Sequence, residues 1–156
     1  GFTSNGLPTV ASDWITDGVL TQLSYDRFTA KERGINKIPT LDAPCLSGTG
    51  PFLPTLQELI THTERAILVT NFWYIRTVNP TDLTLTGMTR DGTFLVENGK
   101  IVSAVKNFRF HESPLRVFNR IGAFTKPAEA ITSETGKLLV PAMTLHDFNF
   151  SSVTRF

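Results

Sequence analysis

The chain has 156 residues, of which 40% are hydrophobic and 19% are charged, so it is long enough for a buried core and is not intrinsically disordered. Its 15 Lys and Arg residues nearly balance its 14 Asp and Glu residues, which gives a formal net charge of +1. Nucleic-acid surfaces need a basic excess, so no direct nucleic-acid partner is expected. No apolar run approaches the roughly 18 residues that span a bilayer, so no membrane association is expected either.

The cysteine content and the first residues restrict where the chain belongs. Cys45 is the single cysteine, which excludes a disulfide within the chain and suits a reducing cytoplasm. The opening residues GFTSNGLPTV contain neither a starting Met nor the basic and apolar regions of a signal peptide. We therefore expect residues 1–156 to form a single domain that comes from a longer protein.

The first third of the chain predicts a hairpin, a short helix and a loop. Asp17-Gly18 joins two extended stretches within residues 9–25, and this dipeptide favours a tight hairpin turn. Asp26 is then a good N-cap for a helix over residues 27–34. Several prolines predict a loop across residues 35–54.

A second helix is predicted where the sequence contains a capping box. The side chain of Thr55 can accept from the Glu58 backbone amide while Glu58 reaches back to the Thr55 amide. Apolar residues follow at helical spacing, so we expect a helix that ends near Glu64.

After this helix the apolar pattern becomes that of strands. Extended segments are predicted at residues 66–69, 72–78 and 83–88. The turn signals Asp91-Gly92 and Asn98-Gly99 enclose a further strand, and both are interpreted as hairpin turns. The resulting prediction is an antiparallel meander of at least three strands.

The last third predicts one further helix and two late strands. Ser113-Pro114 places Pro at the first position of a helix that Gly122 ends. Residues 123–136 are predicted as loop, and residues 138–140 and 145–150 as strands. The predicted fold class is therefore α+β, mainly antiparallel β-sheet with meander and hairpin connections and one or two short helices.

The three histidines offer no catalytic arrangement. His62 ends a predicted helix, where it suits a capping role, and His146-Asp147 would point to opposite faces of a strand. His111-Glu112 matches the start of a zinc-peptidase helix motif, but neither Leu115 nor Arg116 supplies a second ligand. Pro114 also prevents a continuous helix there.

The remaining candidates are interpreted as structural. Glu112 is expected to pair with Arg109 or Arg116, or to lie before the helix N-terminus. Cys45 has no neighbouring cation and is interpreted as a bystander thiol. Phe72-Trp73-Tyr74 could form an aromatic platform for a ligand, although packing is favoured because a strand turns one or two of the three rings toward the core.

A set of short motifs is spread along nearly the whole chain: NGLP (5–8), DGVL (17–20), LQELI (56–60), TER (63–65), LVT (68–70), FWYIR (72–76), LTGMTRDGTF (85–94), ENGKI (97–101), NFRF (107–110), ESPL (112–115) and DFNFSSV (147–153). Their order and spacing resemble the C-terminal region of the TldD/PmbA family, the modulator of DNA gyrase or peptidase U62 proteins.

The resemblance implies an activity that this region does not carry alone. Active members of the family are cytoplasmic zinc metallopeptidases with a His-Glu-x-x-x-His motif upstream of the matched region, and a cysteine near the C-terminal end completes the metal site. A second subunit type lacks these ligands. The two types form a dimer that degrades or trims unfolded peptides, and the link with gyrase requires no DNA contact.

This chain departs from the active pattern. Arg116 stands where the second histidine would follow His111-Glu112, and residues 133–137, where the ligand cysteine would be sought, contain none. The ligand role is not transferred to Cys45. We therefore expect no catalytic residue, no metal ligand and no zinc in this fragment, and no peptide hydrolysis by it alone.

Two function hypotheses follow. In the first, the chain is the C-terminal domain of a metallopeptidase or of its non-catalytic partner subunit, and it frames the peptide channel and the dimer contact. Arg76, Arg90 and Arg109 are the peptide-binding candidates, because guanidinium groups can bind peptide carbonyls or a terminal carboxylate. In the second, the chain is a stand-alone peptide- or carbohydrate-binding module that uses Phe72-Trp73-Tyr74, whose rings must then be exposed.

Overall fold

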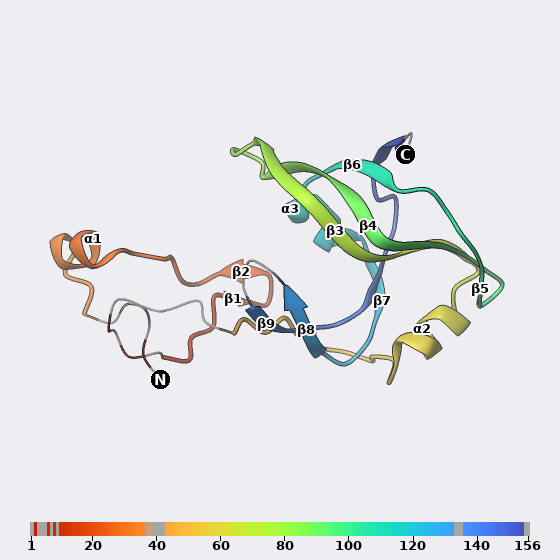
Figure 1. Ribbon diagram of the computed structural model, residues 1–156. Helices are drawn as coiled ribbons and strands as arrows, with labels where there is room; N and C mark the ends of the chain where they lie inside the picture. The colour runs from red at the N-terminus through yellow and green to blue at the C-terminus, as the bar shows by residue number, and fades with distance from the viewer. Residues whose placement is uncertain are drawn as a thin grey trace. The chain divides into compact units, whose positions relative to one another are not determined.

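The structure is a computed structural model that describes residues 2, 6, 8, 10–36, 38, 43–132 and 136–154 (Figure 1). It divides into two compact units, Gly1–Cys45 with Glu129–Leu139 and Leu46–Ala128 with Val140–Phe156. Each unit is described by itself, and the single domain over residues 1–156 stays a prediction. Parts of the predicted loop over residues 35–54, and residues 133–135 of the segment searched for a ligand cysteine, lie outside the described residues.

In chain order, the elements are β1 (Ile15–Thr16), β2 (Val19–Leu20), α1 (Arg27–Glu32), α2 (Leu56–Thr61), β3 (Arg65–Asn79), β4 (Thr84–Glu97), β5 (Lys100–Ala104), β6 (Phe108–Glu112), α3 (Pro114–Val117), the 3-10 turn η1 (Phe118–Arg120), β7 (Ile121–Phe124), β8 (Ala128–Thr132), β9 (Gly136–Val140), β10 (Met143–Leu145) and β11 (Phe150–Val153). The strand pairs are antiparallel and the helices are short, which confirms the predicted α+β class with mainly antiparallel sheet.

The smaller unit contains the predicted hairpin and the first helix. β1 pairs with β2, and Asp17 and Gly18 between them have φ of 51° and 77°, the left-handed values that this tight turn requires. At α1 the Asp26 carboxylate accepts from the Thr29 backbone N–H at 2.8 Å, so the predicted cap is confirmed. β8 pairs with β9, so the prediction of an unbroken loop over residues 123–136 was wrong.

Helix α2 begins at the predicted cap. The Thr55 hydroxyl accepts from the Glu58 backbone N–H at 3.2 Å. The helix ends at Thr61, and His62 follows as the C-cap with its Nδ1 2.8 Å from the Glu58 carbonyl oxygen. The capping interpretation of His62 is therefore confirmed.

The larger unit is built on a five-stranded sheet in the order β11-β6-β4-β3, with β5 also paired to β4. β4 is continuous through Asp91-Gly92, so the prediction of a hairpin turn there was wrong. Val69 pairs with Thr93 and Asn71 with Arg90, which leaves Asp91 and Gly92 opposite one residue of β3 as a β-bulge. A bulge of this kind uses the same positive φ angles as a tight turn, here 60° and 143°.

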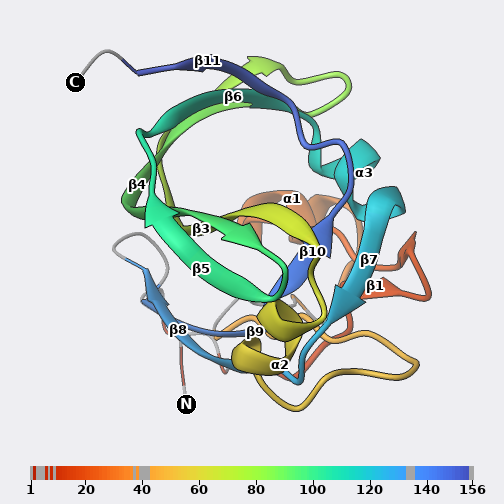
Figure 2. The same cartoon turned by 90° about the vertical axis from the view of Figure 1, so that its right-hand side faces the viewer.

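The bulge bends β4, and its two halves pair with different strands on the same side. The half before the bulge pairs with β6 and the half after it with β5, and Figure 2 shows how strongly the sheet curves between them. The Asn98-Gly99 hairpin turn between β4 and β5 is confirmed. Its two backbone N–H groups donate to the carbonyls of Glu64 at 2.7 Å and Thr63 at 2.9 Å, which fixes the turn to the end of α2.

One face of the sheet carries an aromatic cluster. The rings that contact one another, at centroid separations of 5.0–5.8 Å, belong to Phe72, Phe108, Phe110, Phe148 and Phe150. Phe110 is buried and lies against Gly87 of β4, where an added Cβ would come within 2.7 Å of the ring. Gly87 therefore allows the ring to lie flat against the sheet.

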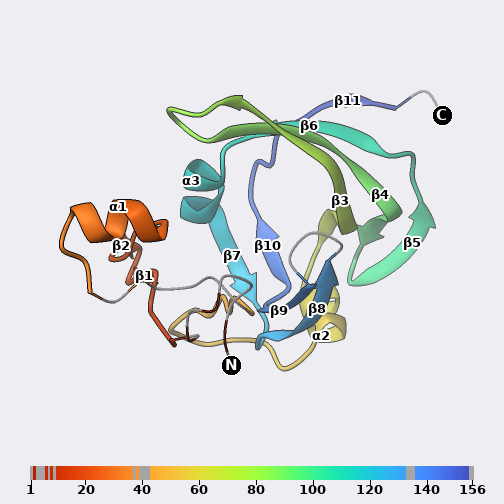
Figure 3. The same ribbon diagram turned by 60° about the vertical axis from the view of Figure 1, so that its left-hand side comes forward.

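The predicted helix after Ser113 is shorter than expected. α3 ends at Val117, which is its buried residue, and the chain continues through η1 into β7, which pairs with β10 (Figure 3). The predicted apolar face was wrong, because Leu115, Phe118 and Ile121 are all exposed. A helix of one turn cannot present a continuous apolar face at 3.6-residue spacing.

Candidate functional site

The strand register places the three predicted arginines on one face of the sheet. Trp73 of β3, Met88 of β4 and Arg109 of β6 pair in register and form one cross-strand row. Directly paired residues project from the same face of a sheet. This face is the opposite of the aromatic cluster, because Phe72 pairs with Thr89, the neighbour of Met88.

Two further rows flank the first on the same face. Arg76, Thr86 and His111 pair in register on one side of it, and Asn71 and Arg90 pair on the other. Thr86 and Arg90 each lie two residues from Met88, so their side chains point to the same side as Met88. Arg76, Arg90 and Arg109 thus share one face, and all three are exposed. We call the three rows the arginine face; they comprise Asn71, Trp73, Arg76, Thr86, Met88, Arg90, Arg109 and His111.

Arg90 is held by contacts on two sides. Its Cζ lies 4.8 Å from the centroid of the Trp73 ring, and its Nε lies 3.4 Å from Asp91 Oδ1. The other carboxylate oxygen of Asp91 accepts from the Asn71 amide at 2.9 Å. A guanidinium stacked on an aromatic ring keeps its in-plane N–H groups available, so Arg90 can still donate to a carboxylate.

Arg76 is stacked in a similar way beside a second bulge. Its Cζ lies 4.3 Å from the Tyr74 ring centroid, and its Nη1 donates to the Ile75 carbonyl at 3.3 Å. Tyr74 has a φ of 57°, and with Ile75 it lies between the paired residues Trp73 and Arg76. The bulge is what returns Arg76 to the face of Trp73, one residue later than regular alternation would.

Arg109 differs from the other two arginines. Its backbone carbonyl accepts from the Ser151 hydroxyl at 3.3 Å, but its guanidinium makes no hydrogen bond, ion pair or ring contact with another described residue. Its charge and donors are therefore available to a ligand.

The edge of β3 next to this face is open. Among the described strands β3 pairs with β4 alone, so the backbone groups on its outer edge have no strand partner. From Phe72 to Asn79 every residue of β3 is exposed, including Trp73 at 41% and Tyr74 at 59%. The Trp73 and Tyr74 rings meet the requirement of the aromatic-platform hypothesis, while Phe72 packs against Phe110 and Phe148, so the expectation that one or two of the three rings face the core is confirmed.

A polar hollow lies where β6 meets α3 and η1. It is lined by His111, Glu112, Arg116, Asn119, Arg120, Asp147 and Asn149. Glu112 is buried and accepts at its carboxylate from Arg120 Nη2 at 2.7 Å and from the backbone N–H groups of Ser113 at 2.9 Å and Asn149 at 3.2 Å. Burial raises the pKa of Glu112, but these hydrogen bonds and the Arg120 charge outweigh it and hold the pKa below its ordinary value. Glu112 pairs with neither Arg109 nor Arg116, so these two expected partners were wrong, but the third expectation is confirmed, because Glu112 lies directly before the N-cap Ser113 of α3.

Arg116 instead pairs with Asp82, just before β4, and with Thr84, the first residue of β4. Its Nη1 donates to Asp82 Oδ2 and its Nη2 to the Thr84 hydroxyl, both at 3.1 Å. The Thr84 hydroxyl donates to Asp82 Oδ1 at 2.7 Å and is the main cause that holds the pKa of Asp82 below its ordinary value. Glu112, Arg116 and Arg120 are thus engaged by neighbouring residues, so these contacts of the hollow are structural.

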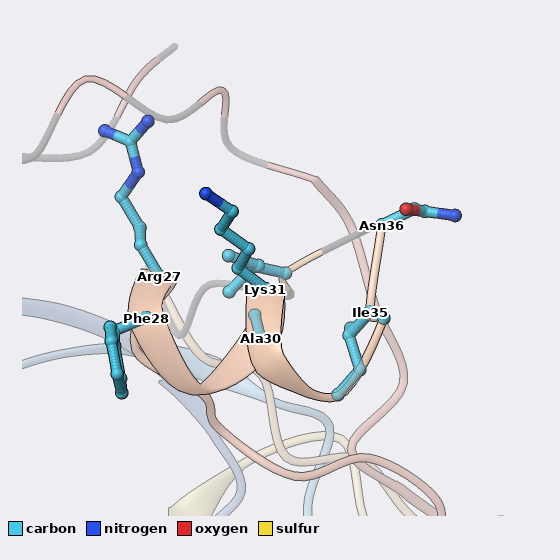
Figure 4. Close-up of a pocket in the computed structure, with 8 residues that line it drawn as sticks. Arg27, Phe28, Ala30, Lys31, Ile35 and Asn36 are labelled. Carbon is cyan, nitrogen blue, oxygen red and sulfur yellow. The ribbon is translucent and has the colours of Figure 1, made fainter.

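A second hollow lies in the smaller unit, beside α1. Figure 4 shows Arg27 and Lys31 on one side of the helix and Phe28 turned away from them. Its other labelled residues, Ala30, Ile35 and Asn36, bring no acid or nucleophile. This hollow has no arrangement that indicates a reaction.

The described residues do not fit the zinc site that the family resemblance implies for catalytic members. Within the described parts of the chain no group of three or more His, Cys, Asp or Glu side chains is close enough to hold a metal ion. Cys45 is a free, exposed thiol. No step that needs zinc is therefore assigned to these residues. In the same described parts, no helix is long and apolar enough to cross a membrane.

Comparison with known proteins gives one family and a fold match. The family model described as "PmbA/TldA metallopeptidase C-terminal domain" matches residues 1–152. A solved structure of TldE from Thermococcus kodakarensis is 16% identical, with a TM-score of 0.72 over 96% of this chain and 35% of that one. A putative modulator of DNA gyrase from Bacteroides thetaiotaomicron is 21% identical, with a TM-score of 0.69 over 97% of this chain and 33% of that one. The chain thus spans about a third of these structures, and no curated protein matches it.

Proposed function

This chain belongs to the family of PmbA/TldA metallopeptidase C-terminal domains, and from this premise we propose that it holds an extended peptide for cleavage. The peptide lies along the outer edge of β3 and next to the arginine face. The chain supplies the scaffold of the peptide channel and a dimer contact, while the metal and its ligands lie outside the described residues.

The open edge of β3 is the observation that carries this proposal. An extended peptide can add to such an edge as a further strand, because main-chain hydrogen bonds are the same for every sequence. A protein that acts on unfolded peptides of many sequences needs a mode of binding of this kind. β3 is 15 residues long, so the edge is long enough for an extended segment of several residues.

The arginine face adds charge to the edge. Of the three candidates, Arg76 belongs to β3 and can donate to the carbonyls or the terminal carboxylate of a peptide bound there, while Arg90 of β4 and Arg109 of β6 lie one and two strands further in and add positive charge to the same face. Charged hydrogen bonds of this type are stronger than those between neutral groups, which supports a role of these residues in orienting the peptide.

The remaining parts of the proposal come from the family. We place the protein in the cytoplasm, as a homo- or hetero-dimer with a subunit of the same family, acting in the degradation or maturation of unfolded peptides. Zinc belongs to the full-length catalytic members. The chain comes either from a catalytic subunit with an upstream His-Glu-x-x-x-His motif or from the ligand-free subunit type.

A stand-alone module for peptides or carbohydrates is the second candidate, because the Trp73 and Tyr74 rings are exposed. Sugars stack on the open face of such rings. Here the guanidinium groups of Arg90 and Arg76 lie over these rings, so a sugar must displace them before it can stack. This arrangement favours a peptide over a carbohydrate.

Backbone-modified peptides test the proposal. We expect the 156-residue chain to bind an unfolded peptide and to lose most of that binding when alternate peptide nitrogens are N-methylated, since methylation removes the main-chain donors. Equal binding of both peptides would rule out strand addition at β3. With zinc added, we expect binding without cleavage, and metal-dependent cleavage by this chain alone would contradict the placement of the metal elsewhere.

A further inference from the structure

We infer that the outer edge of β3 prefers peptides in which an acidic side chain and an aromatic side chain lie two positions apart in an extended segment. This inference rests on the proposed function and adds a sequence preference to a mode of binding that is otherwise indifferent to sequence. The acid lies opposite Arg76 and the aromatic ring opposite Trp73. Both residues belong to the edge strand itself, so no strand separates them from the added peptide.

The spacing of Arg76 and Trp73 matches that of a regular strand because of the bulge between them. Trp73 pairs with Met88 of β4. Arg76 pairs with Thr86, two residues before Met88. β4 therefore crosses the bulge with regular alternation, in which side chains on one face repeat at about 6.8 Å. A regular peptide strand on the outer edge of β3 matches the same spacing, with two alternate side chains opposite Arg76 and Trp73.

The Arg76 guanidinium is held by its neighbours but carries no ion pair. Its Cζ lies 4.3 Å from the Tyr74 ring centroid, and its Nη1 donates to the Ile75 carbonyl at 3.3 Å. No carboxylate of the described residues forms an ion pair with it, and its side chain is exposed. A peptide residue directly opposite has its Cβ about 4.5–5.5 Å from that of Arg76, so an acid there completes a cross-strand charge pair.

Trp73 supplies the aromatic half of the preference. Arg90 stacks on its ring from β4, on the inner side of the edge strand, with its Cζ 4.8 Å from the ring centroid. The Trp73 side chain is still 41% exposed, and no described strand covers its outer side. A peptide side chain opposite Trp73 can therefore pack beside the ring, and aromatic pairs are among the favourable cross-strand pairs.

Short peptides of equal length test the preference. The reference peptide carries Asp at position i and Phe at both i−2 and i+2, so that it suits either direction of the added strand. The Asn peptide has Asn in place of Asp, and the Ala peptide has Ala in place of both Phe residues. Affinity for the 156-residue chain is measured by fluorescence anisotropy of a label on the peptide. We expect the reference peptide to bind about twofold to fivefold more tightly than either of the others, the order of one exposed cross-strand pair.

Variants then assign each preference to one residue. Arg76→Gln should remove the advantage over the Asn peptide and keep the advantage over the Ala peptide. Trp73→Thr, which keeps a residue suited to strands, should do the reverse. Arg65→Gln is the matched control, because Arg65 is an exposed arginine at the first position of β3 that pairs with Glu97. It removes the same charge as Arg76→Gln and should keep both advantages. Circular dichroism confirms that each variant folds.

A fourth peptide tests the spacing. It carries Asp at i and Phe at i−1 and i+1, whose side chains point to the face opposite that of Asp. Trp73→Thr should weaken the binding of this peptide less than it weakens the binding of the reference peptide. Equal weakening of the two peptides overturns the inference, because Trp73 then does not read the face on which Phe projects.

The remaining outcomes separate this inference from the function on which it rests. Equal affinity of the reference peptide and either the Asn or the Ala peptide overturns the inference while strand addition stands. Loss of the preference for Asp in Arg65→Gln as well as in Arg76→Gln also overturns it, because the effect is then one of net charge. Failure of the chain to bind any of the peptides overturns both proposals.

Discussion

Arg120 in η1 lies 2.7 Å from the buried carboxylate of Glu112 in β6, and this ion pair ties the sheet to the segment that follows α3. The Arg120 guanidinium also donates to the backbone carbonyls of Asp147 and, at 3.4 Å, Arg116. A single side chain therefore connects β6, α3 and the turn before β11.

Removal of Arg120 should destabilise the fold. In Arg120→Ala the Glu112 carboxylate, 7% exposed, loses its cation, and we expect the free energy of unfolding to fall by about 3 kcal/mol, measured by urea denaturation. Glu112→Gln added to this variant should recover part of the loss, because the buried charge is then gone. A double variant less stable than Arg120→Ala would contradict this role of the pair.

The same carboxylate predicts how stability depends on pH. Its pKa is below the ordinary value of about 4.3 in the folded chain, so the unfolded chain binds a proton first as the pH falls. The contribution of Glu112 is complete above this pH and is lost as the pH drops from about 4.3 through the folded pKa. Glu112→Gln should therefore show a weaker loss of stability in this window than the wild-type chain. Parallel curves for the two proteins would contradict the assignment.

Gly87 should not tolerate a side chain. The Cβ of Gly87→Ala would lie 2.7 Å from the Phe110 ring and 3.0 Å from the Trp73 carbonyl oxygen, and we expect a loss of about 1–3 kcal/mol in the free energy of unfolding. Phe110→Leu in the same chain relieves the ring contact, so the double variant should cost less than the sum of the two single changes. Additive costs in thermal and urea unfolding would show that the two positions do not clash.

Disruption of a buried hydroxyl network near the Asp91-Gly92 bulge should lower the free energy of unfolding about as much as Gly87→Ala does. Thr89 Oγ1 accepts from the Phe108 backbone N–H at 2.9 Å and from the Thr93 hydroxyl at 2.9 Å, and donates to Asn107 Oδ1 at 3.1 Å. Thr89→Val leaves the Phe108 N–H without this acceptor, while the Thr93 hydroxyl can still donate to Asn107 Oδ1 at 2.9 Å, and the change should cost about 1–3 kcal/mol. The matched control is Thr77→Val on the exposed part of β3, which should change the free energy of unfolding by less than about 0.5 kcal/mol. Similar losses at the two sites would contradict the network.

Local signals in the sequence predicted local structure well. The caps at Asp26 and Thr55 and the turn at Asn98-Gly99 depend on residues within one turn of each other, and each is present. The prediction of a hairpin turn at Asp91-Gly92 failed because a β-bulge and a hairpin turn both need residues with positive φ. Only the length of the partner strand, β3, distinguishes them, and its pairing is set by residues some twenty positions away.

The candidate site was predictable residue by residue but not as a surface. Guanidinium chemistry was enough to select Arg76, Arg90 and Arg109. Their common face depends on the bulge at Tyr74 and Ile75, which shifts the alternation of side chains along β3. Arg120 was not predicted as the partner of Glu112 for a similar reason. The two residues are eight positions apart in the sequence, and the 3-10 turn η1 places Arg120 next to the Glu112 carboxylate.

Hydrogen exchange at the backbone amides of β3 tests the central claim most directly. If an extended peptide adds to the open edge, exchange should slow at alternate amides of β3 when the peptide binds, while the amides of β11, the opposite edge strand, are unchanged. Protection confined to β11 or to the smaller unit, or the absence of protection at saturating peptide, would contradict the account.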